Sequence, residues 1–326
     1  QALSLATRRF NPHEETAMTP CHRFLPAACA ATATLLLAAC TTAPTPPAAS
    51  PAAAAQPVTL RFAAQVNGQP FACGQSYAGV GSTRSTITPS DYRFFVSEVA
   101  LVDAAGRAVP VALAQDGVWQ VDNIALLDFE NGSGPCRNGT TGVNTEVRGS
   151  VPAGRYVGLR FTLGVPFARN HGDPTVAPSP LNLTAMFWNW QGGYKFVKFD
   201  AASSGLQAAP AAPGAGHGGA AASGFSLHLG STVCASPSRT ESPKAECANP
   251  NRVAVAFERF DAAQHTVVAD IGALLAGANV DINTPGTSPG CMSFPGDADC
   301  PAVMAALGLA YGGAAAPGPQ RLFTRR

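Results

Sequence analysis

Short runs in which apolar and polar residues alternate dominate the chain from residue 58 onward. Between 157 and 163, for example, apolar positions alternate with Arg160 and Thr162, which is the pattern of a half-buried β-strand. We predict strands from turn-bounded runs at 58–66, 91–102, 119–127, 155–163, 183–190, 194–199, 225–229 and 253–257. The sequence therefore predicts an all-β fold, an antiparallel β-sandwich or distorted barrel with long loops.

Helical segments are few in this sequence. The two expected helices, at 271–276 and 301–307, are short, and the second begins at Pro301, a residue that suits a first helical turn. The segment 201–224 is almost wholly Ala, Gly, Pro and Ser, so we predict a flexible insertion between two neighbouring strands. Such an insertion would bring the run that ends at 199 beside the run that holds His228.

The residues before 58 are interpreted as a leader and an anchor. Residues 1–17 precede the first methionine and show no hydrophobic periodicity, so we expect them not to be part of the protein. Residues 18–39 predict a lipoprotein signal peptide, whose apolar run at 27–39 is too short to span a membrane. The run ends in Leu-Ala-Ala-Cys40, which resembles a bacterial lipobox with Cys40 as the lipidated residue. An ordinary signal peptide cleaved nearby is the alternative.

The segment 40–57 is built from Ala, Pro, Thr and Ser, a composition that cannot bury a core. We therefore predict a tether that holds a folded domain, residues 58–312, at a membrane of the bacterial cell envelope, with residues 313–326 as a C-terminal tail. We expect the protein to be lipid-anchored in the outer membrane, with the domain facing the periplasm.

Nine cysteines divide between the leader and the expected domain. An even number in an exported domain indicates three disulfides, because disulfides persist in oxidising compartments. No C-x-x-C pair is present, which argues against a tetrahedral metal cage. The sequence alone does not choose among the possible pairings of the six domain cysteines, which are Cys73, Cys136, Cys234, Cys247, Cys291 and Cys300.

Composition and motifs narrow the function classes. The charged fraction is 13% and the formal net charge is +1, so the chain carries no electrostatic footprint for nucleic acid. It also lacks G-x-S-x-G, H-E-x-x-H and P-loop motifs, and we expect no enzymatic activity. Binding must therefore depend on local sites.

Two of the three tryptophans, Trp188 and Trp190, stand two residues apart in one expected strand. Alternate residues of a strand share a face, so the two indoles form either a wedge in the core or a binding site. His171 lies in a Gly/Pro-rich loop, where a ligand could be presented. His228 alternates with Leu227 and Leu229 and faces away from them. Each histidine taken alone fits a structural role equally well or better.

Taken together, these motifs resemble the MbnP-like family, also called the metallo-mystery pair four-Cys motif proteins. The resemblance covers about residues 58 to 311. The residues that carry it are Asn170-His171-Gly172-Asp173, Trp188-Asn189-Trp190, Gly193-Tyr194-Lys195-Phe196, the run 225–234 and the cysteines at 234, 247, 291 and 300. It implies disulfides between Cys234 and Cys247 and between Cys291 and Cys300, which leaves Cys73 with Cys136.

The resemblance also implies a copper site. In this family the first tryptophan of the W-x-W motif, here Trp188 with Trp190 as its motif partner, is oxidised to kynurenine by a di-haem partner of the MauG and cytochrome c peroxidase type. An intact indole N–H is only a donor, whereas the kynurenine amine offers a lone pair to a metal. His171 and His228 are the implied histidine ligands. The chain has no C-x-x-C-H haem motif, so the oxidase must be a separate protein.

The favoured function is thus a cell-envelope copper-binding lipoprotein that serves copper acquisition or homeostasis. Two alternatives stay open. Trp188, Trp190 and Trp119 could form a stacking platform for carbohydrate. The protein could also be a structural lipoprotein without a ligand, with its tryptophans in the core.

Overall fold

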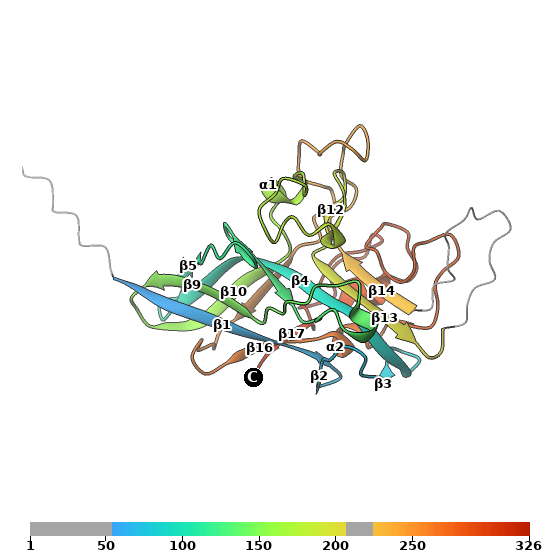
Figure 1. The fold of residues 1–326 in the computed structure, drawn as a ribbon, viewed down its shortest axis with the longest axis horizontal. Helices are drawn as coiled ribbons and strands as arrows, with labels where there is room; N and C mark the ends of the chain where they lie inside the picture. The colour runs from blue at the N-terminus through green and yellow to red at the C-terminus, as the bar shows by residue number, and fades with distance from the viewer. Residues whose placement is uncertain (1–53, 207–223) are drawn as a thin grey trace, which may run out of the picture. The chain divides into compact units, whose positions relative to one another are not determined.

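Two β-sheets pack face to face in the computed structural model, which describes residues 54–206 and 224–326 (Figure 1). The predicted signal peptide, Cys40, nearly all of the tether and most of the predicted insertion lie outside these described residues. The first sheet has the strand order β17-β16-β1-β9-β6, with β2 beside β1. Its strands are β1 (Ala55–Val66), β2 (Gln69–Pro70), β6 (Ala112–Leu113), β9 (Glu146–Pro152), β16 (Thr266–Asp270) and β17 (Phe323–Arg325).

The second sheet has the order β14-β13-β4-β10-β15, and β3, β5, β7 and β8 pair along its long central strand or beside it. A separate two-stranded sheet joins β11 and β12. The strands are β3 (Tyr77–Val80), β4 (Ser85–Asp103), β5 (Ala108–Pro110), β7 (Gln120–Val121), β8 (Ile124–Asp128), β10 (Tyr156–Leu163), β11 (Phe187–Asn189), β12 (Gly193–Tyr194), β13 (Val197–Ser203), β14 (Gly224–Leu229) and β15 (Val253–Phe257).

The helices are short, as the sequence predicts. Asp270 caps α2 by accepting a hydrogen bond from the Gly272 amide at 2.9 Å, and Pro301 occupies the first turn of α3. The helical segments are α1 (Phe167–Asn170), α2 (Ile271–Leu275), α3 (Pro301–Ala306) and two 3₁₀ turns, η1 (Gly134–Cys136) and η2 (Thr184–Met186). Within the described residues, no helix has both the length and the apolar character needed to cross a membrane.

Alternation along β1 directs one face of that strand into the core between the sheets. Leu60 and Phe62 are buried, whereas Thr59 and Arg61 are partly exposed. The Phe62 ring meets rings of the opposite sheet edge to face, with its centroid 5.8 Å from that of Phe161. Burial of each such side chain stabilises the fold by roughly 1.5–3 kcal/mol. The predicted all-β, largely antiparallel fold is therefore confirmed.

Several local expectations differ from the structure. The expected strand at 183–190 begins as η2 and continues only as the short β11, because the chain turns back at Gly192 and Gly193. The expected strand at 119–127 is a tight hairpin of β7 and β8, with Asp122 at a φ of 52° in the turn. The pair β1–β16 is parallel. The two strands are distant in the chain, so no short hairpin turn obliges them to run antiparallel. The expected C-terminal tail contributes β17 to the first sheet.

Three disulfides fasten the loops, joining Cys73 to Cys136, Cys234 to Cys247 and Cys291 to Cys300. These are the pairs that the family resemblance implies. Each closed loop of this kind typically stabilises a domain by about 2–4 kcal/mol. Three disulfides also indicate an extracytoplasmic compartment, because cytosolic thiols are kept reduced.

Candidate metal site

Both faces of β4 are buried, and the site lies on the face that points away from the first sheet. Phe94 faces the first sheet, with its ring centroid 5.4 Å from that of Phe323. Phe95 points the other way and meets Tyr194 of β12 at 5.7 Å. The short β11–β12 sheet therefore covers the outer face of the second sheet. Arg93 shares this outer face and is only 1% exposed, so its charge needs partners inside the protein.

Strand register places four charged or titratable side chains in one row across the outer face. Arg93 of β4 pairs with Asp128 of β8 on one side and with Lys198 of β13 on the other, and Lys198 in turn pairs with His228 of β14. Because directly paired residues point to the same face, this register brings His228 into a row with Asp128, Arg93 and Lys198.

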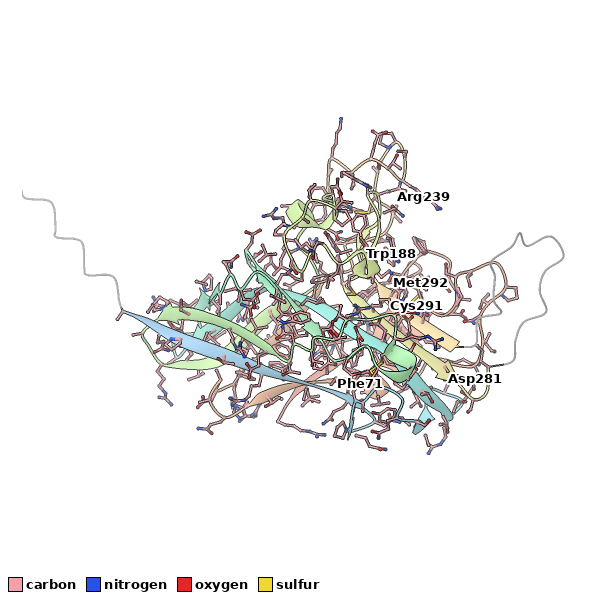
Figure 2. All side chains as sticks on the ribbon, viewed as in Figure 1. Phe71, Trp188, Arg239, Asp281, Cys291 and Met292 are labelled. Carbon is pink, nitrogen blue, oxygen red and sulfur yellow. A yellow bond between two sulfur atoms is a disulfide. The ribbon has the colours of Figure 1, made fainter. Side chains whose placement is uncertain are left out.

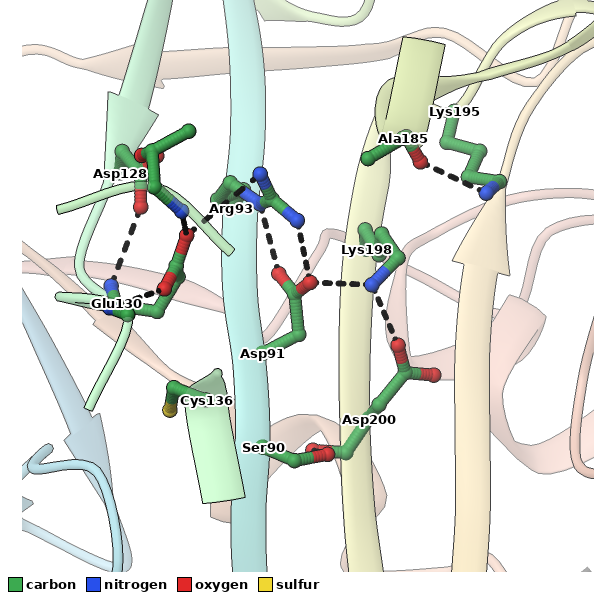
Figure 3. A network of polar contacts seen from close by, with 12 residues as sticks. Ser90, Asp91, Arg93, Asp128, Glu130, Cys136, Ala185, Lys195, Lys198 and Asp200 are labelled. Atoms are coloured by element: carbon green, nitrogen blue, oxygen red, sulfur yellow. Dashed lines mark hydrogen bonds and ion pairs between the residues drawn. The ribbon is translucent and has the colours of Figure 1, made fainter. Parts of the chain in front are cut away.

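Ion pairs join Arg93 and Lys198 of this row to their neighbours (Figure 3). Arg93 donates two hydrogen bonds to Asp91, one of them from Nε at 2.8 Å. Lys198 contacts Asp91 and donates to Asp200 at 2.7 Å. His228 Nε2 lies 2.9 Å from Asp200 Oδ1. The result is a continuous, largely buried ion array, Arg93–Asp91–Lys198–Asp200–His228, that crosses three strands.

The other end of the row carries a carboxyl group with an unusual pKa. Burial raises the pKa of Asp128 to about 7; nearby Arg93 opposes this shift and Glu130 adds to it. The folded state therefore holds a proton on Asp128 that the unfolded chain releases at a much lower pH. Since the folded pKa is raised, this group stabilises the fold below its unfolded pKa, and that contribution is lost as the pH rises toward about 7.

We expect an Asp128→Asn variant to lose less stability than the parent between about pH 4 and about pH 7. The asparagine cannot ionise, and its carbonyl still accepts the hydrogen bond from the Thr140 hydroxyl, which is 2.9 Å from Asp128 Oδ2. The difference in the free energy of unfolding between the parent and the variant should change by up to roughly 4 kcal/mol over this range. Urea unfolding at both pH values measures it, and parallel pH profiles would contradict the shifted pKa.

Next to His228 the outer face opens into a cavity of about 510 Å³. Trp188, Lys195, Met292 and Phe294 line it together with His228. The indole of Trp188 stacks on the Phe294 ring, with centroids 5.6 Å apart and planes inclined by 30°. Figure 2 shows Trp188 and Met292 in this region, above the second sheet. The cavity thus gathers an indole, an imidazole, an amine and a thioether from three segments of the chain, since Trp188 and Lys195 belong to the same hairpin.

Glycine makes room for the tryptophan. A Cβ atom at Gly230 would lie 2.5 Å from Cζ3 of Trp188, closer than any real contact allows. A Cβ at Gly192 would approach Cε3 at 3.3 Å. Both indoles, Trp188 and Trp190, are half-buried and lie outside the buried core. The fold therefore does not give these two side chains a purely structural role in the core.

Met292 reaches the cavity because its segment is paired with β14. Leu227 and Cys291 form a parallel bridge, and the His228 amide donates to the Cys291 carbonyl at 3.0 Å. Leu227 and Cys291 are both fully buried on the core side. The next residue of each segment, His228 and Met292, therefore faces the outer side.

Two basic groups at the cavity are shifted toward their neutral forms. Burial, together with the nearby Lys198 charge, lowers the pKa of Lys195 to about 8. Burial also lowers the pKa of His228, although the hydrogen bond to Asp200 opposes that shift. Asp200 stays ionised: burial would raise its pKa, but the hydrogen bond from His228 and the Lys198 ammonium outweigh burial and lower it. A neutral imidazole is the form that binds a metal.

His171 occupies different surroundings. It is buried, and it is absent from the residues that line the Trp188 cavity. Its Nδ1 lies 3.1 Å from the Trp190 carbonyl oxygen and its Nε2 lies 3.1 Å from Asn170 Nδ2. The Asn170 oxygen accepts from the Tyr194 amide, so its amide nitrogen faces His171. Burial lowers the pKa of His171, which fits a neutral ring that donates from Nδ1 and accepts at Nε2.

His171 also belongs to a buried group that could hold a metal ion. Its nitrogen and the sulfur atoms of Cys234 and Cys247 lie within 4.8 Å of one another. The two sulfur atoms are bonded to each other in a disulfide, however, and a metal prefers thiolates. This group would offer its full set of ligands only after reduction.

The sequence pattern does not single out Met292, Lys195 or Asp200 as residues of this site. Lys195 enters only through the family resemblance, and Asp200 is only the residue that follows the expected strand 194–199. One signal existed for Met292, since it adjoins Cys291 and methionine is rare in this chain, with four in all. The long-range pairing of the Cys291 segment with β14 was not visible in the sequence.

The fold and the cavity define a disulfide-fastened β-sandwich protein with a candidate metal site on the outer face of one sheet. The chain belongs to the MbnP family, whose model matches residues 55–293. It is similar to the solved structure of MbnP from Methylosinus trichosporium, with 32% sequence identity and a TM-score of 0.72. That match covers 83% of this chain and 98% of the other. No curated protein matches the chain.

Proposed function

We propose that this protein is a copper-binding lipoprotein of the bacterial cell envelope that serves copper acquisition or homeostasis. The observation that carries the proposal is the cavity shared by Trp188, His228 and Met292 in a member of the MbnP family. Imidazole and thioether are donors that suit copper, and neither suits a hard cation such as calcium. The proposed anchor is a lipid on Cys40, which tethers the domain at the periplasmic side of the outer membrane.

The proposed ligands come from the residues that converge on the cavity. His228 supplies an imidazole and Met292 a thioether, and Trp188 supplies an aromatic amine after oxidation to kynurenine. The oxidation opens the indole C2–C3 bond with the removal of four electrons and four protons, and two water molecules supply the oxygen atoms of the ketone and the formamide. Hydrolysis of the formamide then releases formate and leaves the amine. The sequence has no C-x-x-C-H haem motif, so the oxidant we propose is a separate di-haem enzyme of the MauG and cytochrome c peroxidase type.

Half-burial of Trp188 is compatible with such a partner. The indole is partly exposed, and it lies beside a cavity that is open to solvent. His171, the second histidine implied by the family resemblance, stays a proposed ligand, and to bind a metal through Nε2 it would have to give up its bond from Asn170. The role we propose is binding of the metal, without enzymatic activity.

The proposal is tested by producing the protein with and without the di-haem oxidase. Without the enzyme, Trp188 should stay intact and copper should bind poorly. With the enzyme, peptide mapping should find kynurenine at Trp188, and metal analysis should find copper. A Trp188→Phe variant keeps the aromatic bulk but cannot form the amine, so it should fold and fail to retain copper even when co-produced.

Trp119→Phe is the matched control. Trp119 packs against the core and does not line the cavity, so its replacement should leave copper content unchanged. The proposal would have to be withdrawn if Trp188→Phe, co-produced with the oxidase, retained as much copper as the parent.

A further inference from the structure

The two ring nitrogens of His228 have different surroundings. Nε2 lies 2.9 Å from Asp200 Oδ1. Nδ1 forms no hydrogen bond with any group in the described part of the chain. The ring lines the cavity that holds Trp188, whereas Asp200 is not one of the lining residues. The Nε2 edge of the ring is therefore turned to Asp200 and away from the cavity.

The contact with Asp200 assigns the proton of the ring. Asp200 is a carboxylate whose second oxygen, Oδ2, accepts a hydrogen bond from Lys198 at 2.7 Å. An ionised carboxylate has no proton to donate, so the hydrogen in the contact with His228 must be carried by Nε2. A neutral ring with its hydrogen on Nε2 has its lone pair on Nδ1.

The ion array holds Asp200 in place. Lys198 is shared between Asp200 and Asp91, and Asp91 is in turn fixed by two hydrogen bonds from Arg93. Arg93 also lies 3.6 Å from the Glu130 carboxylate. Arg93, Asp91 and Glu130 have side chains that are at most 3% exposed. Rotation of Asp200 away from His228 would break its bond to Lys198 and leave the partly buried ammonium with Asp91 alone.

We propose that Asp200, held by Lys198, Asp91 and Arg93, is the positioning residue of the metal site. It fixes His228 as the Nε2–H tautomer and leaves Nδ1 as the nitrogen that binds the metal. The part about the metal rests on the proposed function, whereas the part about the tautomer concerns the metal-free protein. Carboxylate partners of this kind orient many metal-binding histidines and raise their basicity.

The tautomer can be tested without any metal. Nitrogen-15 NMR of the imidazoles in the full mature chain distinguishes a protonated Nε2 from a protonated Nδ1. The parent should show the Nε2–H form at His228. In Asp200→Asn the amide can donate to Nε2, so a measurable share of the Nδ1–H form should appear.

Copper(I) affinity gives the second measurement, on protein whose Trp188 has been converted. Asp200→Asn should weaken binding by about 10- to 100-fold, as is typical when the partner of a ligand histidine is lost. Asp281→Asn is the matched control, because Asp281 accepts hydrogen bonds from Ser85 and Ser203 and does not contact His228. It should change neither the tautomer nor the affinity.

The outcomes separate this inference from the proposed function. A parent with the Nδ1–H tautomer overturns the inference, whatever the copper result. If the parent binds copper and the Asp200→Asn variant binds it with equal affinity, the positioning role alone is overturned. A converted parent that takes up no copper overturns the proposed function and with it the role of Nδ1 as a ligand, while the NMR result still decides the tautomer.

Discussion

Replacing His228 with alanine should weaken copper binding by more than about 100-fold, beyond the loss expected when only the partner of a ligand is removed. The imidazole lines the cavity, burial lowers its pKa, and its Nδ1 forms no hydrogen bond among the described residues. Asp200 cannot replace this donor, since it is committed to Lys198. Trp188 should still be oxidised, because the loss of a ligand need not block the chemistry of the oxidase.

His171→Ala provides the informative comparison. Both nitrogens of His171 are engaged, one with the Trp190 carbonyl and one with Asn170, so we expect its removal to lower stability by about 1–3 kcal/mol. Its effect on copper affinity should be smaller than that of His228→Ala. Competition with a chelator of known copper affinity measures both variants. Equal loss of affinity in the two variants would establish His171 as a ligand and contradict the structural role given to it by its hydrogen bonds.

The second large effect is expected on stability, from Arg93→Met. Methionine keeps much of the side-chain length but leaves the buried Glu130 without its cation and leaves Asp91 with Lys198 alone. Breaking a buried ion pair by removing one partner typically costs about 3–5 kcal/mol. For a domain of this size, that corresponds to a fall in melting temperature of roughly 10 °C. Calorimetry or denaturant unfolding measures it.

Arg148→Met is the matched control for this variant. Arg148 forms an ion pair with Glu146, but its side chain is 68% exposed and well solvated. Exposed pairs contribute about 1 kcal/mol at most. Comparable stability losses for Arg93→Met and Arg148→Met would show that the buried array does not require its arginine.

Much of the local structure was evident in the sequence. Apolar alternation predicted β1, β10 and β15, and the two expected helices are α2 and α3. Such patterns are readable because each side chain's face is decided by its immediate neighbours along the strand or helix. The family resemblance added the three disulfide pairs, and it named Trp188 and His228, which line one cavity.

Tertiary structure decided the surroundings of those residues. The row from Asp128 to His228 exists only because four strands pair in one register, and a shift of a single residue would turn each of these side chains to the other face. Met292 joins the cavity through a bridge between segments 64 residues apart, Leu227 and Cys291. Sequence periodicity therefore determined which faces of the strands are apolar. Long-range pairing, which no local pattern encodes, determined which polar side chains meet.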